Sequence, residues 1–384
     1  SMEEAVLSTD VSGGNATAMQ WLERGNQLYL LRRYQEAVKA FDEVIKQNPD
    51  FVYIAYYGIG LALADNLKES AAALEKAVEK KGNIVPTLHQ QSVVYRELNQ
   101  LDKALIAINK AIKIEPQNPN LYNEKYEVLN RKRECEKAEA AITKAINITP
   151  RAAFYSNRGV FYSNQKNCNQ KNWKSATADF NKAIEINPNY FDAFFNRALV
   201  YSIQTQYELA LADFNKAIQI NPGAAKAYYF RGVFYQGQIK YELALADYSK
   251  VIEINHKYAN AYYNKGLIYH QFLAKLDLAI DNYSKAIELK PNNYEYYNYR
   301  GLVYIDQKKW DLALADYNKA IENNREYASA FSVRGLVYMI KGNKQKAIED
   351  LHKAAQLAIA QINTDLYEMV MNHLRKLRSV FQEN

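Results

Sequence analysis

An all-α fold made of tandem helical hairpins is predicted by three features of this sequence of 384 residues. First, short segments recur with a period of 34, as in residues 183–188 (AIEINP) and 217–222 (AIQINP). Second, each period holds two stretches of apolar residues at helical spacing, with a turn between them. Third, one position of the first stretch is repeatedly Gly or Ala, which lets two helices approach closely. Such internal repetition predicts a solenoid.

Ten windows of about 34 residues cover residues 18–357. They begin near residues 18, 51, 85, 119, 152, 191, 225, 259, 294 and 328. This frame predicts a flexible N-terminal tail over 1–17, ten tandem repeats over 18–357 and a C-terminal capping helix over 358–384. A bend is expected near residue 150, at Thr149-Pro150-Arg151. Window five is longer than the others, and its excess falls between its helices at residues 163–172.

Each window position has a characteristic side-chain size. Position 4 is a large ring, position 8 is small, position 20 is Ala and position 24 is often a ring, as in Tyr228, Gly232, Ala244 and Tyr248 of window seven. Gly inside a helix costs about 0.5–1 kcal/mol relative to Ala, so its recurrence predicts a close contact with the small residue of the second helix. Proline at the end of most windows stops that helix.

Some windows depart from the pattern. Window two ends in Gly82 where others have Pro, and windows three and four carry Ser92 and Tyr126 at the small position. Windows seven, nine and ten also lack the Pro. We expect these windows to pack less regularly.

The pattern ring-4, small-8, Tyr-11, Ala-20, Phe/Tyr-24, Ala-27, Pro-32 resembles that of the tetratricopeptide repeat (TPR) family. The resemblance covers about nine tenths of the chain and rests on seven positions that recur over ten windows. It implies a right-handed superhelical solenoid in which the first helix of each hairpin lines a concave groove. It also implies that this groove binds peptides or partner proteins.

A solenoid needs a polar-backed cap over its last repeat. Leu366, Val370, Leu374, Leu377 and Phe381 form an apolar helical stripe near the C-terminus. Glu368, Arg375, Lys376 and Arg378 can face water on the same helix. A capping helix with a solvated face is the favoured interpretation, and a site for nucleic acid or an acidic partner is the alternative.

Composition indicates a soluble, cytoplasmic protein. The longest run without a charged residue spans 14 residues, 51–64, which is shorter than the roughly 20 that a membrane-spanning helix needs. The first residues show no basic segment followed by an apolar one, so no secretory signal is expected. Cys135 and Cys168 are expected to be free thiols in a reducing compartment, although their spacing also permits a pair. The net charge of +7 is spread along the chain, which does not favour a nucleic-acid partner.

No arrangement of residues typical of an enzyme is found. The sequence lacks a Gly-Lys dipeptide for a phosphate loop, a His-Glu pair for a zinc protease, a Cys-x-x-Cys and a Gly-x-Ser-x-Gly. Its five histidines lie far apart in the windows. We therefore predict a non-enzymatic protein with no cofactor and no metal site.

An Arg at position 7 accompanies an Asp at position 23 in five windows. The pairs are Arg158 with Asp179, Arg197 with Asp213, Arg231 with Asp247, Arg300 with Asp316, and Arg334 with Asp350. Window eight carries Lys265 and Asn282 at these positions. Because positions 7 and 23 lie almost opposite each other in an antiparallel hairpin, we expect ion pairs of structural purpose, within one repeat or between neighbours.

The predicted groove surface lies at positions 2, 5, 9 and 12 of the first helices, which share one helical face. In windows five to ten, position 9 is apolar, and position 5 is aromatic in three successive windows. We expect these residues to form a trough that binds an extended or helical segment of a partner protein. The predicted partner-binding residues are Phe195, Leu199, Tyr229, Val233, Tyr263, Leu267, Asn298, Leu302, Asn196 and Lys226. The alternative is that neighbouring helices bury these side chains within the solenoid.

Three other functions stay open. A chaperone-type carboxylate clamp for a C-terminal peptide is poorly matched, because Asn196 and Lys226 fit while Ser156, Val160 and Phe230 do not. An RNA-binding helical repeat shares the period, but the groove lacks a row of basic residues. Self-association through an exposed end of the solenoid is the third alternative.

Overall fold

The computed structural model describes residues 18–164 and 172–382, with side chains as far as Leu377. Within these residues the chain is entirely helical, with 21 α-helices and no strand. The predicted tail at 1–17 and most of the window-five insertion, residues 165–171, lie outside the described residues.

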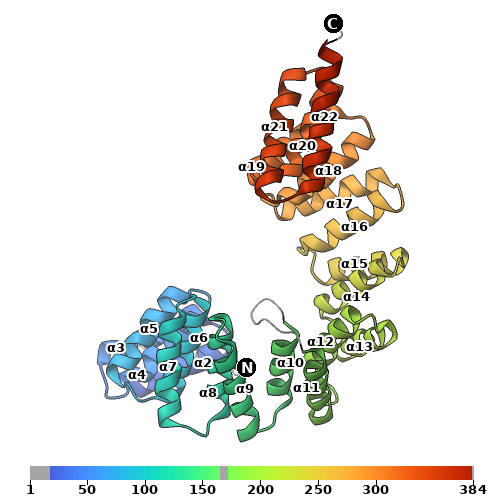
Figure 1. Ribbon diagram of the computed structural model, residues 1–384. Helices are drawn as coiled ribbons and strands as arrows, with labels where there is room; N and C mark the ends of the chain where they lie inside the picture. Colours follow the sequence, from blue (N-terminus) through green and yellow to red (C-terminus); the bar gives the residue numbers. More distant parts are fainter. Residues whose placement is uncertain (1–17, 165–171, 383–384) are drawn as a thin grey trace. The chain divides into compact units, whose positions relative to one another are not determined.

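The chain divides into two compact units, residues 1–205 and 206–384. Within each unit, consecutive helices pack against each other. The helices of unit 1 are α2 (Ala18–Leu30), α3 (Tyr34–Gln47), α4 (Val52–Ala62), α5 (Leu67–Lys80), α6 (Val85–Glu97), α7 (Leu101–Ile114), α8 (Pro119–Arg131), α9 (Cys135–Ile148), α10 (Ala152–Ser163), α11 (Trp173–Ile186) and α12 (Phe191–Ile203). Those of unit 2 are α13 (Tyr207–Ile220), α14 (Ala225–Gly237), α15 (Tyr241–Ile254), α16 (Ala259–Gln271), α17 (Leu276–Leu289), α18 (Tyr294–Asp306), α19 (Trp310–Asn323), α20 (Ala328–Ile340), α21 (Lys344–Ala360) and α22 (Thr364–Gln382). Figure 1 shows hairpin following hairpin along each unit.

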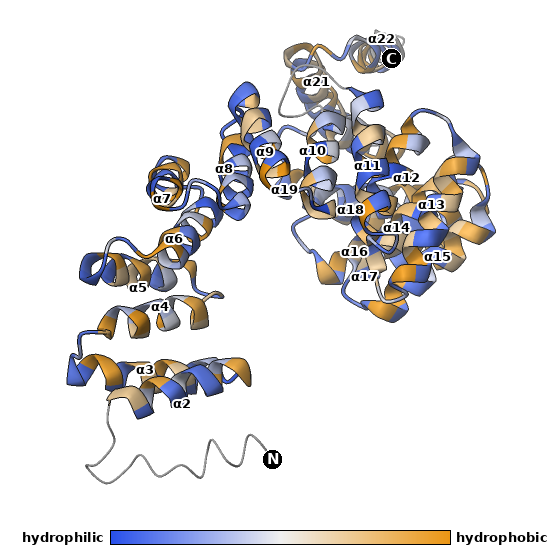
Figure 2. Cartoon of the chain, turned by 90° about the horizontal axis from the view of Figure 1, so that it is seen from below, coloured by the Kyte–Doolittle hydropathy of each residue, from blue (hydrophilic) through white to orange (hydrophobic). Residues whose placement is uncertain are grey.

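The predicted window frame matches the helices. Each window begins with the first helix of a pair, and only α4 starts one residue later than expected, at Val52. Local sequence explains several of these starts: Pro119 is the first residue of α8, where its missing N–H costs nothing. The side chains of Asn66, Asn172 and Asn343 accept hydrogen bonds from backbone N–H groups at the starts of α5, α11 and α21. In Figure 2 the helices carry hydrophobic residues along part of their surface and hydrophilic residues along the rest.

The glycine at position 8 is required by the ring at position 24. A Cβ added to Gly232 would lie 2.8 Å from the Tyr248 ring, and one added to Gly159 would lie 2.6 Å from the Phe180 ring. The prediction that position 8 faces chiefly the small residue of the second helix is therefore wrong in these windows. The glycine makes room for an aromatic side chain that is fully buried.

Windows three and four reverse this arrangement of sizes. Their position 24 holds Ile108 and Ile142, which are smaller than a ring, and their position 8 holds Ser92 and Tyr126. All four side chains are buried, and Tyr126 donates a hydrogen bond to the backbone oxygen of Asn157 at 3.2 Å. In these windows a larger first-helix residue thus accompanies a smaller second-helix residue, and the interior stays filled. The expectation that they pack less regularly stays a prediction.

The two compact units meet in sequence at residue 205, and the bend expected near residue 150 stays a prediction. Across residue 150, one hydrophobic cluster joins Leu129 and Ile142 of window four to Phe154 and Phe161 of window five. Because the core is continuous there, nothing separates windows four and five into different compact units.

The C-terminal helix covers the last hairpin as predicted. Val370, Leu374 and Leu377 of α22 are buried in one cluster with Phe331 and Leu351 of window ten. The polar side chains of Glu368, Arg375 and Lys376 are exposed. Phe381 and Arg378 lie outside the residues whose side chains are described.

A left-handed backbone conformation closes the turn inside most hairpins. The residues concerned are Arg32, Asn99, Arg133, Thr205, Ile239, Ala274, Lys308 and Gly342. Only one of them is a glycine, although positive φ favours Gly. Ile239 is an unfavourable case, because a β-branched side chain is strained at its φ of +61°.

Cys135 is disulfide-bonded, so the prediction of a free thiol there is wrong; the other cysteine of the sequence, Cys168, lies outside the described residues.

In the described part of the chain, no helix combines the length and the apolar character needed to cross a membrane.

Candidate functional site

Five predicted groove residues form a surface on the first helices of unit 2. Tyr229 and Val233 lie one helical turn apart on α14, Tyr263 and Leu267 lie likewise on α16, and Leu302 is on α18. Residues four apart share a helical face. We call these five residues the first-helix row.

Contacts between tyrosines and asparagines hold these helices in register. Asn264 of α16 donates a hydrogen bond through Nδ2 to the Tyr229 hydroxyl of α14 at 3.1 Å. The Tyr263 ring of α16 lies 5.1 Å from the Tyr296 ring of α18, and the Tyr296 hydroxyl donates to Asn260 Oδ1 at 2.6 Å. Ring pairs at such distances stabilise by about 0.5–1.5 kcal/mol beyond area burial. The backbone under the first-helix row is therefore pre-organised.

The row remains accessible to solvent to different degrees. Val233 is 41% exposed, and the other four side chains are partly exposed. Burial raises the pKa of Tyr229 and of Tyr263 above the ordinary value of 10. Both hydroxyls are consequently neutral at physiological pH, and the row presents apolar and weakly polar surface without charge.

Asn298, the predicted polar member at position 5 of window nine, is only 6% exposed. Tyr317 of α19 packs against this part of α18 and donates a hydrogen bond to the Asn298 backbone oxygen. Asn298 therefore presents almost no surface to a partner. Lys226 of α14 is exposed, as are Asn260 and Glu295 at the starts of α16 and α18.

The three predicted residues of window six belong to unit 1. Phe195 is 6% exposed and stacks on Phe191 of the same helix, with 5.8 Å between ring centroids. It is therefore buried, against our expectation of an open ring. Leu199 and Asn196 are partly exposed on α12.

Of the three residues that do not fit the carboxylate clamp, Ser156 is buried, Val160 is partly exposed and Phe230 is exposed. A buried serine cannot contact a peptide carboxylate. Ser156 therefore does not replace the residue that the clamp pattern requires in window five.

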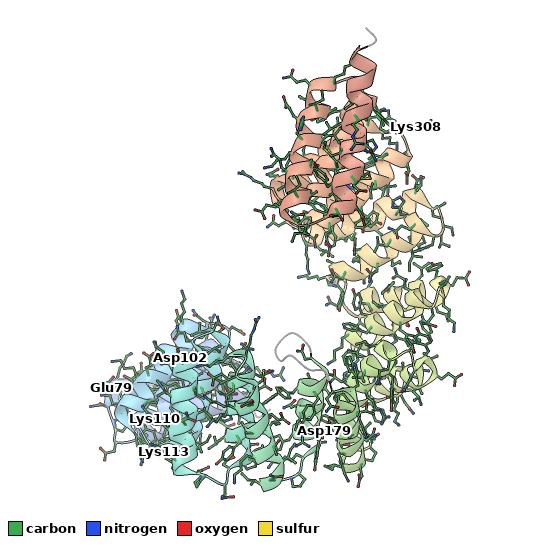
Figure 3. All side chains as sticks on the ribbon, in the orientation of Figure 1. Glu79, Asp102, Lys110, Lys113, Asp179 and Lys308 are labelled. Carbon is green, nitrogen blue, oxygen red and sulfur yellow. The ribbon has the colours of Figure 1, made fainter. Side chains whose placement is uncertain are left out.

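The predicted ion pairs form within single hairpins. Arg231 donates two hydrogen bonds to the Asp247 carboxylate at 2.7 and 2.8 Å. The same two-pronged contact joins Arg158 to Asp179, Arg300 to Asp316 and Arg334 to Asp350. Asp179, the aspartate of the window-five pair, lies on α11 and is labelled in Figure 3. The hydrogen bonds with Asp247 raise the pKa of Arg231 above its ordinary value. The fifth pair, Arg197 with Asp213, would join the two units and stays a prediction.

The position-7 arginine of windows five, six, seven, nine and ten also makes a contact that sequence reasoning missed. Its third nitrogen donates to a polar residue at position 25 of the preceding window, as Arg231 does to Asn215 at 2.7 Å and Arg300 does to Ser284 at 3.0 Å. Even in window eight, Lys265 donates to Ser249 at 3.0 Å. The recurrence of Asn or Ser after the position-24 ring was the available signal. These cations thus join each hairpin to the one before it.

Two other features lie near the first-helix row. A hollow of about 630 Å³ opens at the loop before α18, lined by residues 290–295. His270 of α16 contacts Asp306 of α18 through Nε2 at 2.7 Å. Among the described residues, no group of three or more His, Cys, Asp or Glu side chains is placed to hold a metal ion.

Family models match three parts of the chain. The model of the TPR repeat matches residues 240–271, 275–307 and 301–342, a second tetratricopeptide repeat model matches 180–212, and the model of the Psidin N-terminal TPR repeats region matches 28–156. The chain belongs to the tetratricopeptide repeat family. Proteins of this class generally act as protein-interaction scaffolds.

Curated relatives resemble parts of the chain. Human tetratricopeptide repeat protein 13 is 24% identical over 168 residues, which are 44% of this chain and 16% of that protein. The uncharacterized protein MJ0572 of Methanocaldococcus jannaschii is 41% identical over 58 residues, 15% of this chain and 62% of that protein. The chain thus spans less than two thirds of the length of either relative.

Two solved structures are similar to the chain to different degrees. Yeast Tom70 is 14% identical with a TM-score of 0.51, and the match covers 96% of this chain and 99% of that one. YrrB, described as a TPR protein with an unusual peptide-binding site, is 28% identical with a TM-score of 0.42 over 51% of this chain and 97% of that one. The first likeness supports the helical-hairpin fold.

Proposed function

We propose that this chain is a non-enzymatic, cytoplasmic scaffold that binds an extended or helical segment of a partner protein along the first-helix row of unit 2. One observation carries the proposal. Uncharged apolar and aromatic side chains recur at equivalent positions of α14, α16 and α18, and they remain partly exposed on helices that tyrosine contacts hold in register. A surface that met only water would be expected to carry polar residues there.

The free energy of burying single side chains sets the number of contacts that the partner segment must make. Burying one Leu or aromatic side chain yields about 1.5–3 kcal/mol, and micromolar affinity requires about 8 kcal/mol. At least three or four anchors are therefore needed once ordering costs are subtracted. Neighbouring first helices about 10 Å apart would each span about three residues of extended peptide. The partner segment should thus carry aliphatic residues at regular intervals.

A peptide library selected against the full chain tests this proposal. We expect selected peptides to contain spaced aliphatic residues, and we expect their binding to survive both high salt and amidation of the C-terminus. Binding that disappeared on amidation would instead support a carboxylate clamp, since the clamp needs a free carboxylate. Recovery of RNA-dependent complexes with strong salt dependence would favour the RNA-binding alternative.

Self-association is tested separately. Light scattering of the chain with and without residues 364–384 measures whether α22 limits assembly. We expect the intact chain to be a monomer and the shortened chain, whose last hairpin loses its cover, to associate. Dimers of the intact chain would instead support the alternative that the chain binds a second copy of itself.

A further inference from the structure

A hollow of about 280 Å³ lies on the window-four hairpin of unit 1. Tyr122 and Lys125 of α8 and Lys137, Ala140, Ala141 and Lys144 of α9 line it. We call it the lysine hollow. It lies on a different unit from the first-helix row and shares no residue with it.

The lysine hollow occupies the place where other windows hold an aspartate. In windows five, seven, nine and ten, the position-23 carboxylate fills the space beside the position-7 arginine. Window four keeps a cation at position 7, Lys125, but has Ala141 at position 23. The methyl group of Ala141 cannot reach the cation, so a space remains and the positive charge keeps no internal partner.

The charges around the lysine hollow are one-sided. Among the described residues, neither Lys125 nor Lys144 forms an ion pair, and no lining residue is acidic. Lys137 pairs with Glu134 at 2.9 Å. Two further exposed lysines, Lys110 and Lys113, lie on the neighbouring helix α7 (Figure 3). The potential here favours an anion.

Window one provides an internal comparison. A hollow of about 270 Å³ lies at the same window positions and also has an alanine, Ala40, at position 23 beside a position-7 cation, Arg24. Its positions 19 and 26 are Glu36 and Glu43, where window four has two lysines. The two hollows thus agree in position and volume and differ in charge.

We propose that the lysine hollow binds the carboxylate of an Asp or Glu side chain from an acidic segment of a partner protein. A carboxylate is the group that this chain itself places at the equivalent position in four other windows, where it accepts two hydrogen bonds from the cation. Lysine ammonium groups donate charge-assisted hydrogen bonds of the same kind. The apolar floor of Ala140, Ala141 and the Tyr122 ring fits the methylene stem of the entering side chain.

Restoring the missing aspartate tests the proposal. The probe is a fluorescently labelled peptide rich in Asp and Glu, titrated with the full chain at low salt and followed by fluorescence polarisation. Ala141→Asp should occupy the lysine hollow from within and weaken binding by about tenfold or more. The matched control, Ala40→Asp in window one, should leave the affinity unchanged. Should Ala141→Asp fail to fold, the double variant Lys125→Gln/Lys144→Gln, which alters side chains at the surface, takes its place with the same expected loss.

Equal affinity of the wild type and of these variants would overturn the proposal. A peptide in which phosphoserines replace the acidic residues distinguishes the source of the anion. Tighter binding of that peptide, lost in Ala141→Asp, would overturn the assignment to a carboxylate and indicate a phosphate site. Weaker or equal binding of the phosphopeptide supports the carboxylate.

Discussion

Windows one to four of unit 1 and the windows of unit 2 fill the space between their paired helices in different ways. In windows seven, nine and ten of unit 2, an arginine and an aspartate close one side of the hairpin. In windows seven to nine, a tyrosine ring packs over a glycine. In windows three and four, aliphatic residues replace the ring and larger side chains replace the glycine. In windows one and four, the cation remains without its aspartate. The same helical frame therefore tolerates different interiors provided that opposite positions change together.

The comparison also separates two kinds of surface. Three of the four position-7 cations of unit 2, Arg231, Arg300 and Arg334, pair with an aspartate of the same hairpin. The fourth, Lys265, contacts the neutral Ser249. The first helices of this unit present uncharged apolar residues. Window four of unit 1 leaves Lys125 unpaired among the described residues and presents a cationic hollow. The two proposals accordingly assign different parts of a partner to the two surfaces, an apolar segment to the first-helix row and an acidic segment to the lysine hollow.

The largest effect that would sharpen this comparison is expected for Arg231→Ala. Its removal leaves the buried carboxylate of Asp247 without a cation, which costs about 3 kcal/mol of local stability. Lys125→Ala, at the same position of window four, should cost less than about 0.5 kcal/mol because no partner is lost. Amide hydrogen exchange of the affected hairpins measures both values. Equal losses in the two windows would show that the ion pair has no structural purpose.

Gly232→Ala should destabilise the window-seven hairpin by about 1–3 kcal/mol, because the added Cβ meets the Tyr248 ring. Gly237 is the matched control in the same helix, since no atom lies within 4 Å of a Cβ added there. Gly237→Ala should be neutral or stabilising by up to about 1 kcal/mol. Thermal unfolding monitored by circular dichroism compares the two. A harmless Gly232→Ala would contradict the size coupling between positions 8 and 24.

Removing single hydroxyl groups from two position-24 rings should have opposite effects. The Tyr248 hydroxyl donates to Gln236 at 2.8 Å and accepts from Asn264 at 3.3 Å, so Tyr248→Phe should cost about 1 kcal/mol. The Tyr283 hydroxyl is buried with no hydrogen-bond partner among the described residues. Tyr283→Phe should therefore be neutral or stabilising. Windows five and six already have phenylalanine at this position, in Phe180 and Phe214. Denaturant unfolding of the two variants tests this, and an equal loss in both would contradict it.

The smallest effect concerns the turn of window seven. Ile239 adopts a left-handed conformation while 73% exposed, and window ten has Gly342 at the equivalent place. Ile239→Gly should stabilise the turn by about 1 kcal/mol. Lys308→Gly, at the same position of window nine, provides a comparison with a side chain that is not β-branched. A lower melting temperature for Ile239→Gly would show that the exposed side chain makes a stabilising contact.

Much of the fold could be predicted from the sequence because the pattern repeats. The position-7 arginine is an example: an aspartate at position 23 recurs in the same windows, so the sequence indicates that the two residues form an ion pair. Features that occur once could not be predicted in this way. In window four a large residue, Tyr126, stands where other windows have glycine, and a smaller one, Ile142, stands where they have a ring. Only the structure shows that the two side chains are buried in one cluster. The bonded state of Cys135 depends on distances that sequence spacing does not give.

The candidate site was predicted less completely than the fold. Helical spacing places Tyr229, Val233 and their equivalents on one face, but it does not tell which of them a neighbouring helix covers. Phe195 and Asn298 share position 5 with Tyr229, and both are buried. The lysine hollow was not predicted because it arises where an aspartate is missing. Ala141 indicates the site only when it is compared with the aspartate at the same position of other windows.

The central claim is that the first-helix row binds the partner, and a matched pair of substitutions in window seven tests it most directly. Val233→Asp changes an exposed residue of the row on α14, and Leu243→Asp changes a residue of α15 that is 49% exposed and outside the row. The affinity of a selected peptide for each variant is measured by isothermal titration calorimetry after circular dichroism has shown both to be folded. We predict a loss of about tenfold or more for Val233→Asp and no change for Leu243→Asp. Unchanged affinity for Val233→Asp, or an equal loss in both variants, would contradict the account.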